Sequence, residues 1–196
     1  MPSQNECNQA LQNLILMNRK KIDVYDNLTE IVKELKEGVL LTAKADDQVN
    51  SMTISWGMLG IEWGRPVFVT FLREHRFTKE LIAKNGEFTV NIPYGQDAKD
   101  ILNFCGTKSG RDVDKFRELG LTPVEAEKIS VPAIRELPLT LECKVVYKQE
   151  QDPDQISEKR KKIFYPADVD GSFHGANRDY HTAYYGQILS AYILED

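Results

Sequence analysis

The sequence predicts a mainly β protein, built as a β-barrel with appended helices. Segments of strand length, rich in β-branched and aromatic residues, are short and spread evenly along the 196 residues. Helical segments occur between some of these strands, but strands and helices do not alternate regularly as they do in a doubly wound sheet. There is no internal repeat or low-complexity tract, and the length suits one medium domain with a real core.

Composition and charge exclude several function classes. Apolar residues make up 41% and charged residues 28% of the chain, which is typical of a soluble globular protein. The net charge of −5 argues against general nucleic-acid binding through a basic face. No apolar run reaches membrane-spanning length and no signal peptide is apparent. We therefore expect a cytoplasmic protein without nucleic-acid or membrane partners.

Cysteine and histidine usage gives no metal signal. The three cysteines lack CxxC spacing and fit a reducing cytoplasm better than a disulfide frame or a zinc site. Three histidines are too few for a His-rich metal site, so we expect no metal. The cysteines are Cys7, Cys105 and Cys143, and the histidines are His75, His174 and His181.

The N-terminal part predicts two amphipathic helices. Residues 1–19 carry leucines and an isoleucine among Asn and Gln, a pattern that suits packing on a neighbour or a partner subunit. Residues 28–36 repeat the pattern and stop at Gly38. We expect residues 1–37 to form a helical extension and residues 38–196 to form the barrel domain.

A β-hairpin follows this extension. Residues 39–45 and 48–56 read as strands joined by a turn at Asp46-Asp47. The second strand carries small polar side chains, Asn50-Ser51-Met52-Thr53, where hydrophobic ones would be expected. Such a strand leaves room for the backbone to approach a flat ring with polar edges. An edge strand with hydrated side chains explains this stretch alone equally well.

Residues 67–81, VFVTFLREHRFTKEL, are the stretch around which the chain is organised. The opening apolar run predicts a buried strand. Thr78 is expected to be the N-cap of a helix over residues 79–85. A strand that brings Arg73, Arg76 and a hydroxyl to a helix start predicts an anion site, best suited to phosphate. The alternative is a solvated turn with ordinary surface charges.

The remaining elements follow from alternation and turn residues. Strands are expected at residues 59–63, 87–92, 139–149 and 185–194. Helices are expected at residues 96–104 and 152–164, the second starting with Pro153. Residues 106–116 are expected to form a polar loop that enters a short helix, residues 119–132 an irregular segment and residues 165–181 a long surface loop.

Two turns concentrate positive charge in this acidic chain. Residues 71–84 and residues 108–117 each hold an excess of two positive charges, and each holds a Ser or Thr. Gly106 and Gly110 free the second turn to point its amides toward an anion. Together with the hairpin, the two turns indicate a phosphorylated aromatic cofactor.

The order of these motifs resembles the flavin reductase-like, FMN-binding split-barrel family, which includes flavoredoxins. The resemblance spans residues 38–194 and rests on NSMTISW, RFTKELI, EFTVNIP, KSGRDVDKF, LPLTLEC and YYGQI, in this order. It implies a six-stranded Greek-key split β-barrel that forms a homodimer, with FMN in a groove near the subunit interface.

The resemblance also implies the residues that bind FMN. The isoalloxazine ring would be lined by Asn50, Ser51, Met52 and Thr53. Trp56 stacks near the ring or, alternatively, packs in the core. The phosphate end would be held by Arg73, Arg76 and Thr78, together with Phe77 between them. The segment closing over the cofactor would contain Lys108, Ser109 and Gly110, with Arg111 and Lys115 nearby.

The implied function is an FMN-binding oxidoreductase that transfers a hydride from NAD(P)H to flavin and passes electrons to an acceptor, a monooxygenase or a redox protein. The flavin carries the chemistry, so no catalytic side chain is expected, and Cys105 is interpreted as a bystander. No GxGxxG motif occurs, so NAD(P)H would lie directly against the flavin. The alternatives are an FMN-binding electron carrier without NAD(P)H activity and a non-flavin, phosphate-binding module. His174 and His181 receive no role.

Overall fold

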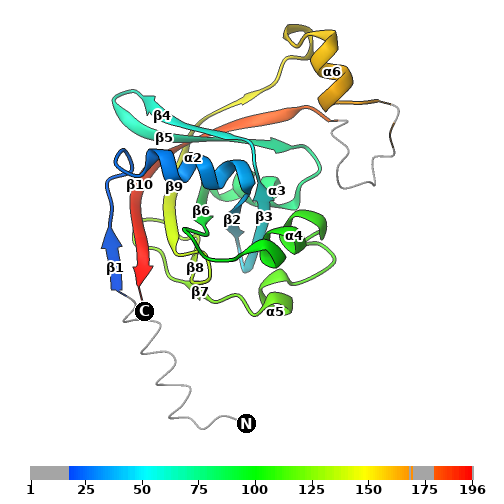
Figure 1. Cartoon of the computed structure of the whole chain (residues 1–196). Coiled ribbons are helices and arrows are strands. Elements are labelled where there is room, and N and C mark those ends of the chain that lie inside the picture. The colour runs from blue at the N-terminus through cyan, green and yellow to red at the C-terminus, as the bar shows by residue number, and fades with distance from the viewer. Residues whose placement is uncertain (1–17, 168, 170–178, 196) are drawn as a thin grey trace.

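The computed structural model describes residues 18–167, 169 and 179–195 (Figure 1). Eight strands form one antiparallel sheet in the order β3-β2-β6-β9-β10-β5-β4, with β1 paired to β10. These strands are β1 (Asn18–Lys21), β2 (Val39–Ala45), β3 (Gln48–Ile54), β4 (Gly57–Glu62), β5 (Arg65–Arg73), β6 (Glu87–Ile92), β9 (Leu139–Glu150) and β10 (His181–Glu195). A separate pair consists of β7 (Pro123–Val124) and β8 (Ala133–Ile134).

The sheet curls around an apolar core but does not close. Inward-facing side chains such as Leu41, Phe68 and Phe88 are fully buried in one cluster. The end strands β3 and β4 follow each other in sequence, yet no pairing joins them within the described residues. The mainly β split barrel with appended helices is therefore confirmed. The main sheet has eight strands rather than the expected six, partly because the polar segment β1, NRKK, pairs with β10.

The hairpin of β2 and β3 agrees with the sequence prediction. Its strands pair from Val39↔Ile54 to Ala45↔Gln48 around the Asp46-Asp47 turn. Asp46 has a φ of 53°, a left-handed conformation that Asp tolerates in turns. Strand β3 ends at Ile54, two residues before the expected end at Trp56.

Helices cover both faces of the hairpin. Helix α2 (Leu28–Glu37) buries Ile31 and Leu35 in the main core. Helix α4 (Lys99–Thr107) contacts β3, and a second apolar cluster beneath it contains Leu40 and Cys105. The other helices are α3 (Phe77–Asn85), α5 (Lys115–Leu119), η1 (Pro153–Gln155) and α6 (Glu158–Phe164). Among the described helices, none is long and apolar enough to cross a membrane.

Two helix predictions were wrong in detail. Helix α4 begins three residues later than expected and includes Gly106. The helix expected over residues 152–164 is two pieces, because Ile156 N donates to the Pro153 carbonyl and closes a 3₁₀ turn. Most of the helix expected over residues 1–19 and most of the predicted 165–181 loop, including His174, lie outside the described residues. The domain boundary at residue 38 stays a prediction.

Candidate functional site

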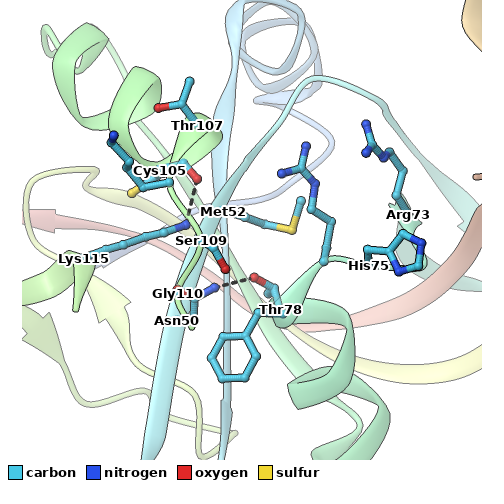
Figure 2. A pocket seen from close by; sticks show the side chains of 13 residues that line it. Asn50, Met52, Arg73, His75, Thr78, Cys105, Thr107, Ser109, Gly110 and Lys115 are labelled. Carbon is cyan, nitrogen blue, oxygen red and sulfur yellow. Dashed lines mark hydrogen bonds between the residues drawn. The ribbon is translucent and has the colours of Figure 1, made fainter. Parts of the chain in front are cut away.

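Most of the expected site residues meet in one pocket of about 280 Å³. It lies where β3, the end of β5, the start of α3 and the segment from α4 to α5 come together (Figure 2). Its lining residues are Asn50, Met52, Arg73, His75, Arg76, Phe77, Thr78, Cys105, Thr107, Lys108, Ser109, Gly110 and Lys115. The two cationic turns, which are separated in sequence by β6 and α4, therefore share one hollow.

Among the residues expected to face the ring, Ser51, Thr53 and Trp56 do not line this pocket. Arg111, which was expected nearby, does not line it either and pairs with Glu80. Side chains alternate along β3, so Asn50 and Met52 face the pocket and their neighbours face away. Ser51 Oγ lies 2.7 Å from Thr42 Oγ1 in the sheet, and Thr53 Oγ1 donates to the Leu102 carbonyl. Trp56 lies beyond the end of β3, where its ring is 4.9 Å from that of His181. The side chains of these three residues are not brought to the pocket.

Thr78 lies in the first turn of α3, so its prediction as the N-cap was wrong. Arg76 has the extended backbone of a cap, and the helix starts at Phe77. Thr78 Oγ1 instead accepts a 2.8 Å hydrogen bond from Asn50 Nδ2, and both residues are buried (Figure 2). This bond fixes the start of α3 against β3 and orients the pocket wall.

Four cationic side chains line the pocket, and none of the described lining residues is a carboxylate. They are Arg73, Arg76, Lys108 and Lys115. Arg73 Nε lies 3.3 Å from Asp179 Oδ1, whereas the Arg76 side chain makes no hydrogen bond or ion pair within the described residues. Burial, reinforced by the charge of Arg73, lowers the pKa of Arg76, yet a guanidinium stays charged at neutral pH. The pocket therefore suits an anionic group.

Lys115 is a buried cation at this pocket and is only 3% exposed. Its Nζ donates to the carbonyl oxygens of Ser51 at 2.7 Å and Cys105 at 2.8 Å. Burial lowers the pKa of Lys115 to about 8; the Cys105 thiol raises it and Arg76 lowers it further. Lys115 therefore ties β3 to α4 and places a titratable charge beside the pocket.

Gly110 packs directly against Asn50. A Cβ atom at this position would lie 2.1 Å from Asn50 Oδ1, far inside van der Waals contact. A side chain there would displace the buried amide that holds Thr78. The glycine thus permits a close approach of the 108–117 turn to β3.

The pocket includes three residues that were not expected at the site: His75, Cys105 and Thr107. His75 and Thr107 each lie within two residues of a predicted cation, and this proximity is the only sequence signal for them. Burial raises the pKa of the Cys105 thiol to about 11, partly offset by Lys115. The thiol therefore stays protonated at neutral pH, in agreement with a bystander role.

His181 lies next to this pocket without lining it. Its Nδ1 is 3.1 Å from the Tyr165 hydroxyl oxygen. In the sheet, His181 of β10 is the pairing partner of Arg73 of β5. Burial lowers the pKa of His181 to about 4, and the charge of Arg73 lowers it further. The ring is therefore neutral at pH 7 and adds no charge to the pocket.

Comparison with known proteins identifies the family. Residues 36–196 match the flavin reductase like domain. An uncharacterized protein of Archaeoglobus fulgidus is 32% identical over 120 residues, covering 61% of this chain and 66% of that protein. The chain spans less than two thirds of the length of the curated relatives it matches.

Solved structures share the fold. Flavoredoxin from Methanosarcina acetivorans matches with a TM-score of 0.58 and 26% identity, over 81% of this chain and 68% of that one. Nitrilotriacetate monooxygenase component B from Bacillus cereus matches with a TM-score of 0.60 and 14% identity, over 99% and 78% of the two chains. Since the family match covers most of the chain, this protein belongs to the flavin reductase-like family.

Proposed function

We propose that this protein binds FMN and transfers a hydride from NAD(P)H to the flavin. The observation that carries the proposal is the pocket in which four cationic side chains surround Thr78, Ser109 and Gly110. Cations, hydroxyl groups and accessible backbone amides are the donors that a phosphate monoester requires. Membership of the flavin reductase-like family supports flavin as the bearer of that phosphate.

The residues divide into two groups in this proposal. Arg73, Arg76 and Lys108 bind the phosphate end, while Asn50 and Met52 border the space for the ribityl chain and ring. Ser51 contributes through its carbonyl, which orients Lys115, rather than through its hydroxyl. FMN supplies the hydride and electron chemistry when bound, so the protein's part is to bind, orient and tune it.

Addition of NADH or NADPH to the FMN-loaded protein without oxygen tests the reaction. We expect rapid loss of the visible flavin absorbance, because the sequence holds no GxGxxG motif and NAD(P)H would meet the flavin directly. Loaded protein without nicotinamide is the control. An unchanged spectrum would eliminate hydride transfer and leave an FMN-binding electron carrier, which the likeness to flavoredoxin favours. Failure to take up flavin at all would leave a non-flavin, phosphate-binding module.

The partner assignments belong to the same proposal. We infer a cytoplasmic homodimer that passes electrons to a monooxygenase or another redox protein. The likeness to a monooxygenase component supports such a partner. Light scattering on the purified protein tests the dimer, and a monomeric mass at micromolar concentration would remove it.

FMN affinity is expected to fall as the pH rises through about 8. Lys115 is protonated below this pH and loses its charge above it, while the phosphate of FMN stays dianionic above about pH 6. The attraction between Lys115 and the phosphate is therefore complete below about pH 8 and is lost above it. Quenching of FMN fluorescence between about pH 6.5 and 9.5 measures the dissociation constant.

Two lysine variants test whether Lys115 causes this pH dependence of FMN binding. Lys115→Met should bind FMN more weakly near pH 7 and show no transition near pH 8. Lys84→Met, at an exposed lysine in the last turn of α3, should keep the wild-type profile. If Lys115→Met retained the same pH dependence, another group would be responsible for it.

A further inference from the structure

A second cavity, of about 420 Å³, lies between α6, η1 and the chain just beyond β3. It is lined by Trp56, Gln151, Gln155, Ile156, Arg160, Phe164 and Tyr165. None of these residues lines the cationic pocket, so the two hollows are distinct. Figure 1 shows α6 standing apart from the barrel at the far ends of β9 and β10.

Aromatic rings form the walls of this cavity. The rings of Trp56 and Phe164 meet edge to face, with centroids 5.7 Å apart at an angle of 82°. Both remain open to solvent, with Trp56 36% and Phe164 42% exposed. Tyr165 is buried behind them. A planar ring entering the cavity would cover apolar surface and stack on an aromatic face, which is favourable.

Two polar side chains of the cavity, Gln151 and Arg160, can donate hydrogen bonds to a ligand. Gln151 Oε1 already accepts bonds from the Tyr165 hydroxyl at 2.8 Å and from His181 N at 3.0 Å. These bonds fix the amide and leave its NH₂ group for a ligand. The Arg160 side chain makes no hydrogen bond or ion pair within the described residues, and no carboxylate is among the side chains that line the cavity. The cavity therefore complements an acceptor with negative charge.

His181 lies next to the cavity, and its strand pairs with β5, which contributes to the cationic pocket. Its ring centroid lies 4.9 Å from that of Trp56 at an interplanar angle of 38°, and its backbone pairs with Arg73 of the other site. The two sites are neighbours that can be filled independently.

We propose that this cavity binds a small planar aromatic carboxylate. The ring lies against Trp56 and Phe164, and the carboxylate pairs with Arg160. The amide of Gln151 donates to a further acceptor on the ligand. The proposal does not depend on flavin binding, since it uses no residue of the cationic pocket.

Tryptophan fluorescence tests the proposal with benzoate as the probe. The chain has two tryptophans, and Trp63 is 66% exposed at the turn between β4 and β5. In a Trp63→Phe background Trp56 is therefore the sole reporter. We expect saturable quenching by benzoate in this background. Benzamide, which has nearly the same shape without the charge, should bind about tenfold more weakly, because it cannot form the ion pair.

Two variants at neighbouring positions of α6 test whether Arg160 supplies the positive charge that pairs with the carboxylate. Arg160→Gln should weaken benzoate binding about tenfold and leave benzamide binding unchanged. Lys159→Gln, at the adjacent exposed position, should bind benzoate like the parent. Absence of saturable quenching, equal affinity for benzoate and benzamide, or equal losses in the two variants would each overturn the proposal. The benzoate–benzamide comparison on the parent decides the matter even if a variant does not fold. None of these results bears on FMN binding.

Discussion

Arg76→Ala is expected to weaken FMN binding far more than riboflavin binding. Arg76 lines the cationic pocket and its guanidinium has no hydrogen-bonding or ionic partner within the described residues, so its charge is available to a ligand. Only FMN carries the phosphate, and losing a charge-assisted contact costs about 1.5–3 kcal/mol. This corresponds to a loss of about 10- to 150-fold in affinity. Parallel fluorescence titrations with the two flavins measure the difference.

Lys159→Ala is the control for this measurement, because Lys159 lies on α6 outside the pocket. It should leave the affinity for both flavins unchanged. Equal losses for FMN and riboflavin in the Arg76 variant would show that Arg76 acts through folding instead of phosphate recognition.

Glu142→Gln is expected to lower the free energy of unfolding by about 3 kcal/mol. Glu142 is fully buried in β9 and accepts hydrogen bonds from Glu127 N at 2.8 Å, Lys128 N at 2.7 Å and the Tyr192 hydroxyl at 2.8 Å. Both carboxylate oxygens act as acceptors, so an amide NH₂ in place of either one would face a donor and leave it unsatisfied. Urea denaturation followed by circular dichroism measures the change.

Glu150→Gln is the matched control, since Glu150 is exposed at the end of the same strand. Its free energy of unfolding should stay within about 0.5 kcal/mol of the wild type. If the two variants lost the same small amount, the buried hydrogen bonds of Glu142 would not be holding residues 127–128 to the sheet.

Local sequence signals predicted much of the fold. The strands β2 and β6 have the predicted bounds, and β5 and β10 extend their predicted segments by a few residues. Their apolar alternation and flanking turns act over neighbouring residues, so the sequence alone contains them. Strand β1 was missed because NRKK has no apolar pattern and is held by pairing with β10, at the other end of the chain.

Element ends were less predictable, because they depend on competing contacts. Thr78 has the side chain of an N-cap, but its hydroxyl accepts from Asn50, 28 residues away, and Arg76 takes the cap position. Pro153 starts a helical turn as predicted, but that turn ends as a 3₁₀ segment before α6 begins. In the first case the capping side chain is engaged by a distant strand, and in the second a local hydrogen bond from Ile156 N to the Pro153 carbonyl closes the turn before α6 begins.

The sequence by itself determined that this chain is a mainly β member of a flavin-related family with two cationic turns, because strand periodicity and charge are carried by neighbouring residues. Only the tertiary structure decided that the turns share one pocket, that Lys115 is buried against the Ser51 and Cys105 carbonyls, and that Trp56 belongs to a second cavity with α6. These features depend on the pleat of β3 and on contacts across long stretches of chain. No local pattern specifies such contacts, because burial and pairing arise only when the sheet has formed.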